Sequence, residues 1–267
     1  MTAFGGEVAG FYRRYRHGYP EAVIDVLAAV FGLTPADTVI DLGCGTGQLT
    51  LPLAGRVHTV LGVDPEPDML RCARQAAGDA GVPNVTWVLG ADSDLPALTR
   101  LLGAGSVAAV TVGQALHWMR REDLLRDAVA LVRPGGGVAV VTNGTPLWLQ
   151  DTDWSRALRS FLQDWLGQTL TAACGTDQES QRRYAGELDQ AGFEVLTDAV
   201  DYTAELTLDD IVGGIYSALS QHQLPPPAER PDFTARVGRA LGSHSSFTEQ
   251  VHVAILAGRK PHPNQVG

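Results

Sequence analysis

Short apolar runs alternate with amphipathic segments along the first half of the chain, and this alternation constrains the fold more than any other feature. The apolar runs cover residues 38–42, 58–64, 85–89, 107–112 and 138–142. Apolar residues at helical spacing cover residues 20–32, 68–77 and 121–132. Unbroken apolar runs are typical of strands that helices cover on both faces. The alternation therefore predicts a parallel, doubly wound sheet of the α/β class.

The regular alternation of apolar runs and amphipathic segments ends after Asn143. A helical stripe with two tryptophans predicts a helix over 154–166. Further helices are expected over 179–191, 208–219 and 233–241, and further strands over 193–202 and 250–257. The prediction is thus a Rossmann-like sheet of about seven strands, mostly parallel, with the last strand antiparallel. Two stretches, 145–178 and 206–245, are expected to form helical cap insertions in one domain spanning 1–267.

The composition argues against several classes of protein. Lys and Arg total 20 against 30 Asp and Glu, so the net charge is −10, whereas nucleic-acid binding needs clustered cations. No run reaches 18 apolar residues, and the first ten residues lack a basic, apolar leader, so neither a membrane span nor a signal peptide is expected. Cys44, Cys72 and Cys174 form no CxxC pair, which is typical of a reduced, cytoplasmic protein.

A glycine-rich turn, Asp-Leu-Gly-Cys-Gly-Thr-Gly over 41–47, follows the first apolar run. Glycines let a ligand approach the backbone, and free N–H groups face it at the start of a helix. The spacing is GxGxG, whereas the dinucleotide fingerprint of nicotinamide oxidoreductases is GxGxxG. Asp64 ends the second run, where an acid accepts hydrogen bonds from ribose hydroxyls. Asp92 follows the third run, where an acid can accept a hydrogen bond from an adenine amino group. The glycine-rich turn and these two acids together predict an adenosyl ligand.

These motifs resemble the class I S-adenosylmethionine-dependent methyltransferases, in the small-molecule branch called type 11. The family's segments are matched by residues 41–47, 61–70 and 131–142. Residues 15–20 and 114–118 are similar to the YxRPxYP and QAxHW motifs of the trans-aconitate methyltransferase-like group, but His17 stands where that group usually has proline. The resemblance covers residues 10–145, and 193–258 by strand pattern only. It implies S-adenosyl-L-methionine as cofactor, S-adenosyl-L-homocysteine as product and an N-terminal lid over 1–20.

The resemblance also implies a set of cofactor-binding residues: Tyr15, Arg16, Asp41, Gly43, Cys44, Gly45, Gly47, Asp64, Pro65, Met69, Ala91, Asp92, Gly113 and Gln114. The glycines would line the methionine portion, with Asp41 near its amino group and Asp64 on the ribose. Pro65 and Met69 would flank the adenine, although helical spacing fits Met69 equally well as a core residue. Gly113 and Gln114 would begin the loop under the sulfonium, with Tyr15 and Arg16 closing over the ligand.

His117 follows the fourth strand at the edge where ligands of such folds bind. Histidine titrates near neutrality, so His117 is the candidate general base for a hydroxyl acceptor. It is equally compatible with a packing role beside Trp118. Alignment of the acceptor can supply effective molarities of about 10⁵–10⁸ M. No histidine or carboxylate cluster has metal-ligand spacing, so no metal is expected.

The acceptor pocket is expected to involve aromatic residues, namely Tyr12, Trp118, Trp148 and Tyr216. The same stripes are compatible with simple packing of the cap onto the sheet. We therefore expect methyl transfer to an oxygen or nitrogen of a small molecule of secondary metabolism, with neither nucleic acid nor membrane as partner. Two alternatives stay open: carboxyl methylation of a small polyacid, favoured by Arg13, Arg14 and Arg16, and a non-methylating adenosyl-binding protein. The oligomeric state is not indicated.

Overall fold

A computed structural model describes residues 4–171, 174–242 and 246–262. The chain forms two compact units. Unit 1 comprises Met1–His17, Gly144–Cys174 and Asp201–His252; unit 2 comprises Gly18–Asn143, Gly175–Val200 and Val253–Gly267. The lid and the cap insertions stay predictions. Within the described ranges, no helix combines the length and the apolar character that crossing a bilayer requires.

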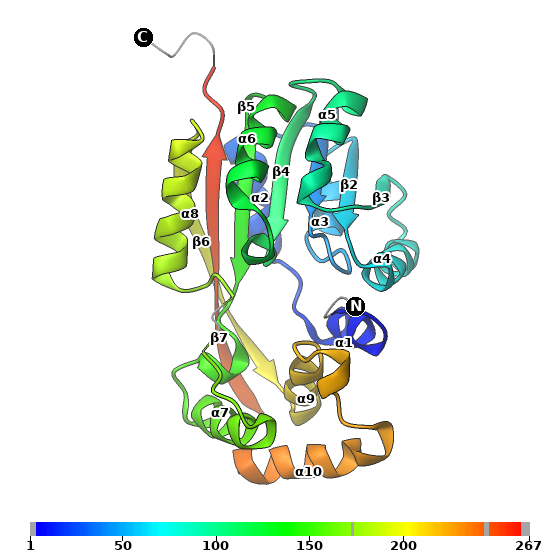
Figure 1. Cartoon of the computed structure of the whole chain (residues 1–267), viewed down its shortest axis with the longest axis vertical. Coiled ribbons are helices and arrows are strands. Elements are labelled where there is room, and N and C mark those ends of the chain that lie inside the picture. Colours follow the sequence, from blue (N-terminus) through cyan, green and yellow to red (C-terminus); the bar gives the residue numbers. More distant parts are fainter. Residues whose placement is uncertain (1–3, 172–173, 243–245, 263–267) are drawn as a thin grey trace. The chain divides into compact units, whose positions relative to one another are not determined.

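Seven strands form one sheet in the order β3-β2-β1-β4-β5-β7-β6 (Figure 1). Their bounds are β1 Thr38–Leu42, β2 Thr59–Asp64, β3 Val85–Leu89, β4 Val107–Gly113, β5 Val132–Asn143, β6 Glu194–Leu206 and β7 Phe247–Arg259. The pairs from β3 to β5 are parallel, and β5 pairs with β7 antiparallel. The predicted Rossmann-like sheet, mostly parallel with an antiparallel last strand, is confirmed.

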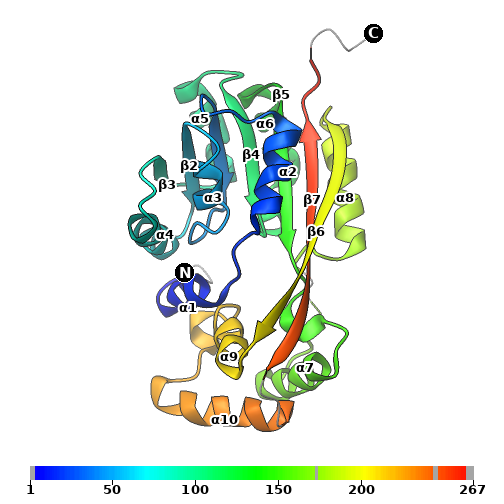
Figure 2. The same ribbon diagram turned by 180° about the vertical axis from the view of Figure 1, so that it is seen from behind.

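The helices are α1 Glu7–Tyr15, α2 Glu21–Phe31, α3 Thr50–Ala54, α4 Pro67–Ala80, α5 Leu95–Leu102, α6 Arg121–Leu131, α7 Asp153–Leu166, α8 Gln178–Gln190, α9 Leu208–Tyr216 and α10 Arg230–Leu241. In unit 2, α5 and α6 cover one face of the sheet and α2 and α3 the other (Figures 1 and 2). Local signals set their ends. Gly32 and Gly81 adopt left-handed conformations after α2 and α4, and Glu66 accepts a hydrogen bond from Asp68 N at the start of α4.

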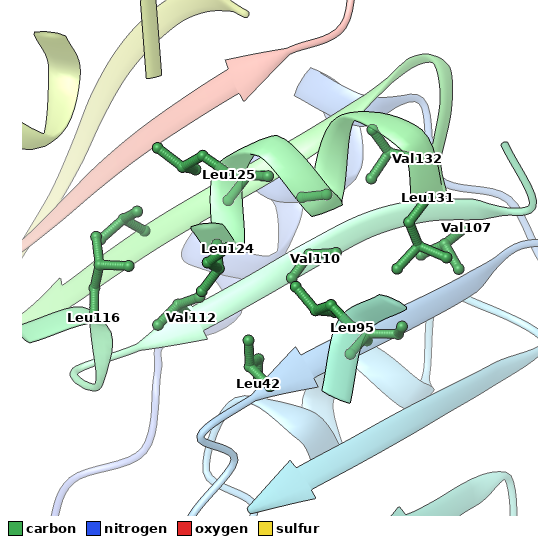
Figure 3. Packing of buried hydrophobic residues seen from close by; sticks show 14 of the residues in the cluster. Leu42, Leu95, Val107, Val110, Val112, Leu116, Leu124, Leu125, Leu131 and Val132 are labelled. Carbon is green, nitrogen blue, oxygen red and sulfur yellow. The ribbon is translucent and has the colours of Figure 1, made fainter. Parts of the chain in front are cut away.

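The main core of unit 2 lies between the sheet and α5 and α6. Leucines of these helices interlock with valines of β4 and β5, as Figure 3 shows for Leu95, Leu124, Val110 and Val112. Each of these four side chains is at most 1% exposed. Every residue of β4 from Val107 to Val112 is buried, as the unbroken apolar runs predicted.

The sequence placed the start of β5 too late, at residue 138 instead of Val132. The stretch includes Pro134 and three glycines, which normally argue against a strand. Here close backbone approach requires glycine, because a Cβ at Gly137 would lie 1.9 Å from the carbonyl oxygen of Gly258. The pairing of β5 with β4 is irregular between Val107 and Ala109, which absorbs the extra residues.

Unit 1 has a separate apolar core, built from α7, α9 and α10 with the end of β6 and the start of β7. Leu158 and Leu162 face this core from the predicted helical stripe of α7, which is N-capped by Thr152. Phe233 and Tyr216 meet at 5.5 Å between ring centroids. The stripe of α7 is therefore a packing face.

Candidate functional site

The glycine-rich turn connects β1 to α3 at the carboxyl edge of the parallel strands in unit 2. Gly43, Gly45 and Gly47 have φ values of +70°, +53° and +91°, which favour glycine. The backbone N–H groups of Gly43 and Cys44 donate to the carbonyl oxygen of Val63 at 2.8 and 3.0 Å. The turn is therefore tied to the neighbouring strand β2, in the conformation that the GxGxG spacing requires.

Asp64 ends β2 and joins the turn to the start of α4. Its Oδ2 accepts from the backbone N–H of Gly45 at 2.9 Å, and its Oδ1 accepts from the N–H of Glu66 at 2.8 Å. Burial raises the pKa of this carboxyl. Each carboxylate oxygen has further acceptor capacity beyond one hydrogen bond. Asp64 and Gly45, which the sequence predicted to share a ligand, therefore meet directly.

Asp41 lies beneath the turn with 1% exposure. Its carboxylate accepts from the hydroxyls of Thr50 and Thr111, from α3 and β4. Burial raises its pKa to about 6, although these hydroxyls oppose the shift. The carboxylate thus links β1 to α3 and β4 through these two hydrogen bonds. Its proximity to the amino group of the methionine portion stays a prediction.

The segment after β3 contains the residues predicted to read the adenine. The carboxylate of Asp92 accepts from the backbone N–H of Arg120 at 2.9 Å, with the guanidinium Nε at 4.0 Å. Ala91 N donates to Asp94 Oδ2 at 2.9 Å. Asp94 therefore orders this turn. Arg120 is a neighbour that sequence reasoning missed, because its proximity to Asp92 depends on packing between distant segments.

Pro65 and Met69 flank the start of α4. Pro65 is exposed, whereas Met69 is 4% exposed and lies on the buried face of the helix. The core reading of Met69 that its spacing allowed thus agrees with its burial, and adenine contact by either residue stays a prediction.

The turn after β4 carries backbone strain. Gln114 adopts φ +54°, which is unfavourable for a residue with a side chain. Its Nε2 donates to the carbonyl oxygen of Asn143 at 3.1 Å, while its buried Oε1 has no hydrogen-bond partner among the described residues. A buried acceptor on a strained residue is typical of a ligand site, and a donor group of the ligand would satisfy it.

Tyr19 is a second neighbour that the sequence did not assign. A Cβ built on Gly113 would lie 2.8 Å from the Tyr19 hydroxyl, so glycine leaves room for that hydroxyl at the end of β4. Asn143 Nδ2 also donates to the carbonyl oxygen of Gly18 at 3.3 Å. Residues 18 and 19 therefore lie at the carboxyl ends of β4 and β5. The signal for this was present, since Tyr19 belongs to the motif over 15–20.

His117 lies in the short 3-10 helix Leu116–Trp118, directly after the strained turn. Its ring centroid is 4.9 Å from that of Trp118, which is 67% exposed. Burial lowers the pKa of His117. A lowered pKa keeps the imidazole neutral at pH 7 but makes it a weaker base.

The remaining predicted residues belong to unit 1. The Tyr15 hydroxyl donates to Asp209 at 3.0 Å, and the Arg16 guanidinium lies over the Tyr12 ring at 5.5 Å. Tyr216 is 4% exposed in the unit 1 core, against which Trp148 also packs. Their contacts with cofactor or acceptor stay predictions. Within the described ranges, no three His, Cys, Asp or Glu side chains gather as metal ligands, and the expectation of a metal-free site also stays a prediction.

The family model and the relatives that match this chain are all described as methyltransferases. Residues 39–136 match the family model described as "Methyltransferase domain". An uncharacterized methyltransferase of Mycobacterium tuberculosis H37Rv is 37% identical over 143 residues, covering 54% of this chain and 53% of the relative. An uncharacterized methyltransferase of Synechocystis is 33% identical over 61% of this chain and 70% of the relative. Trans-aconitate 2-methyltransferase of Azoarcus is 35% identical over 48% and 47%.

The fold has a counterpart among solved structures. The putative type II methyltransferase of Anaeromyxobacter dehalogenans superposes with a TM-score of 0.60 and 25% identity, covering 93% of this chain and 100% of that chain. The chain spans about half the length of the Mycobacterium and Azoarcus relatives.

Proposed function

Since this chain belongs to the class I S-adenosylmethionine-dependent methyltransferase family, we propose that it methylates an oxygen or nitrogen atom of a small molecule of secondary metabolism. The observation that carries this proposal is the hydrogen bond between the glycine-rich turn and the Asp64 carboxylate. We also propose that the protein works in the cytoplasm. The net charge of −10 supports a small-molecule acceptor over nucleic acid.

The residues present fit the cofactor. Asp64 offers buried carboxylate oxygens that suit ribose hydroxyls. Gln114 offers an unpartnered buried Oε1 that suits an N–H donor such as the ammonium group of methionine. Gly43 and Gly47 keep side chains out of the turn, since a Cβ at Gly43 would lie 2.6 Å from the Ala115 Cβ. When bound, S-adenosylmethionine supplies an electrophilic methyl group.

For His117 we keep the two roles that the sequence leaves open. As a base, it would take a proton from a hydroxyl acceptor. As a positioning residue, it would pack against Trp118 and orient the turn after β4. Its lowered pKa and its aromatic neighbour support positioning more than proton transfer.

A second candidate function is carboxyl methylation of a small polyacid. The printed name of the Azoarcus relative supports it, since trans-aconitate is a tricarboxylate. A carboxylate acceptor has no proton to lose at neutral pH, so it would need cationic groups and no base. A third, a protein that binds the adenosyl ligand without methyl transfer, would have the same binding residues.

Calorimetry with S-adenosylmethionine and with NAD tests the assignment. We expect micromolar binding of S-adenosylmethionine and S-adenosylhomocysteine and no binding of NAD. Release of S-adenosylhomocysteine is then measured against phenols, amines and trans-aconitate. Absence of S-adenosylmethionine binding would contradict the proposal, and binding without turnover of any acceptor would favour the non-methylating alternative.

A further inference from the structure

Asp92 lies in the turn after β3, and one main-chain hydrogen bond ties it to the start of α6. Its Oδ2 accepts from the backbone N–H of Arg120 at 2.9 Å. The two residues are 28 positions apart in the chain, and both belong to unit 2. Among the described residues, this N–H is the one hydrogen-bond donor to the Asp92 carboxylate. It therefore fixes the orientation of a side chain that is only 16% exposed.

The guanidinium of Arg120 contributes less to this orientation than the main chain does. Its Nε is 4.0 Å from Asp92 Oδ2, beyond hydrogen-bond distance, and its Nη1 is 3.6 Å from Asp123 Oδ2. The Arg120 side chain is 66% exposed, and ion pairs at exposed positions are screened by water and salt. The backbone N–H is therefore the group of Arg120 that sets the direction of the Asp92 carboxylate.

The backbone on both sides of this N–H is held by hydrogen bonds of its own. Met119 N donates to the carbonyl oxygen of Leu116 at 3.1 Å, at the end of the short 3-10 helix after β4. The carbonyl oxygen of Arg120 accepts from Leu124 N at 3.0 Å, in the first turn of α6. The donor that Asp92 uses thus lies on an ordered segment between the turn after β4 and a helix.

One oxygen of the Asp92 carboxylate is left for a ligand. A carboxylate has about four acceptor sites on its two oxygens, and no hydrogen bond from the described residues reaches Oδ1. Asp92 follows the carboxyl end of β3, the edge where ligands of doubly wound sheets bind. The exocyclic amino group of adenine is an N–H donor that this oxygen can accept from. With Oδ2 engaged by Arg120, Oδ1 is the acceptor for that group.

We propose that Arg120 is a positioning residue for adenine recognition, acting through its backbone N–H. The N–H holds Asp92 so that Oδ1 accepts from the adenine amino group, and Arg120 itself touches neither cofactor nor acceptor. This inference rests on the proposed methyltransferase function and on the predicted role of Asp92 in it. It names the group that makes the site select an adenosyl cofactor over one with a 6-oxo base.

The conformation of Arg120 allows this N–H to be removed without a change of backbone. Its φ is −82°, close to the value of about −65° that proline fixes. Met119 before it is extended, with φ −105° and ψ 158°, which a following proline permits. Proline is also common at the start of a helix. In Arg120→Pro the ring occupies the position of the N–H, so Asp92 loses its donor and has to turn away.

The first test compares the binding of S-adenosylhomocysteine and S-inosylhomocysteine to the full-length protein by calorimetry. The inosyl compound has a carbonyl oxygen in place of the amino group, so it offers Asp92 no donor. The wild type should prefer the adenosyl compound at least tenfold, because a hydrogen bond to a charged group is lost with the other. Asp92→Ala and Arg120→Pro should each lower this preference at least threefold. A wild-type preference below tenfold, or a smaller drop in Arg120→Pro, would overturn the proposal.

Two further variants separate the N–H from other effects of the substitution. Arg120→Ala keeps the N–H and removes the guanidinium, so its preference should stay within twofold of wild type. Gln178→Pro is the matched proline control, since Gln178 is the exposed first residue of α8 and follows an extended residue, Asp177 with ψ 153°. Its preference should also stay within twofold. A larger drop in either variant would overturn the assignment to the Arg120 N–H.

A double variant shows whether Arg120 acts through Asp92. If the N–H acts only on the carboxylate, Arg120→Pro combined with Asp92→Ala should have the preference of Asp92→Ala alone, within twofold. A general disturbance of the site would instead add its own loss to that of Asp92→Ala. Additive losses would therefore overturn the positioning role.

The amide proton of Arg120 gives a measurement that does not depend on the folding of the proline variant. In NMR spectra of the full-length protein, its signal should move upfield in Asp92→Ala, because the hydrogen bond to the carboxylate is lost. The amide signal of Gln178 is the internal control and should stay in place. An Arg120 signal that does not move would overturn the bond. Absence of binding of both S-adenosylmethionine and S-adenosylhomocysteine to the wild type would instead overturn the proposed function.

Discussion

The backbone N–H of Gly45 donates a 2.9 Å hydrogen bond to Oδ2 of Asp64, 19 residues further along the chain. One carboxylate therefore fixes the glycine-rich turn after β1 and also accepts from Glu66 N before α4. Since β1 and β2 are neighbours in the sheet, this bond ties together the turns that follow the two strands. The residue proposed to bind ribose is thus also the residue that shapes the turn.

Asp64→Ala should weaken S-adenosylmethionine binding at least tenfold, because it removes both the proposed ribose acceptor and the anchor of Gly45. Calorimetry measures the affinity, and circular dichroism checks the fold. Asp25→Ala is the control, since Asp25 is exposed on α2 and pairs with Arg56. An affinity within twofold of wild type would show that Asp64 does not bind the ribose.

Gly43→Ala should destabilise the protein by about 2–3 kcal/mol, because the new Cβ would lie 2.6 Å from the Ala115 Cβ at a φ of +70°. Gly78→Ala is the matched control. Gly78 is in α4 with open space around it, so alanine there should stabilise the helix by up to about 1 kcal/mol. Urea unfolding measures both values. Equal effects at the two positions would contradict the tight approach at Gly43.

Gln114 allows stability and binding to be separated. Gln114→Gly relieves the strain of φ +54° and should leave the unfolding free energy unchanged or raise it by about 1 kcal/mol. The same variant removes the unpartnered Oε1 and should weaken S-adenosylmethionine binding about tenfold. Thermal unfolding and calorimetry measure the two effects. A stabilised variant with full affinity would show that Oε1 does not contact the ligand.

Asp41 should make stability fall as pH rises. Its folded-state pKa of about 6 lies above the ordinary value of 3.8, so between these values the folded protein holds a proton that the unfolded chain has lost. This contribution is complete below pH 3.8 and lost as pH rises through about 6. Tm is measured for the wild type and for Asp41→Asn from pH 4 to 8. As the pH rises, the Tm of the wild type should fall relative to that of Asp41→Asn. A difference independent of pH would contradict the raised pKa.

The sheet could be predicted because its strands are unbroken apolar runs, such as Val107–Val112. Such a run indicates burial on both faces of the sheet without information from distant residues. The start of β5 could not, because its glycines are set by the backbones of Ala108 and Gly258, which lie far from them in sequence. Proline and glycine read locally indicate a turn there.

The site was predicted as residue types at strand ends, which is where topology brings Asp64 and Gly45 together. The hydroxyl pair around Asp41 and the contact of Tyr19 with Gly113 depend on side chains from distant segments. Within unit 1, His17 Nε2 lies 3.3 Å from Glu249 Oε2, a pairing that spans 232 residues and has no local signal. Contacts between residues so far apart in the sequence cannot be predicted from hydrophobic periodicity or from the spacing of motif residues.

Gly213→Ala should separate α1 from α9 within unit 1, because a Cβ at Gly213 would lie 2.2–2.4 Å from atoms of the Tyr15 ring. Overpacking of this kind costs about 1–3 kcal/mol. Gly10→Ala is the control, since Gly10 is in α1 with nothing near its Cβ position. The double variant Gly213→Ala with Tyr15→Ala should recover part of the loss, because it removes the clashing ring. Urea unfolding of the wild type, of Gly213→Ala, of Tyr15→Ala and of the double variant gives the coupling energy between the two sites. Strictly additive effects would contradict the packing of the Tyr15 ring on Gly213.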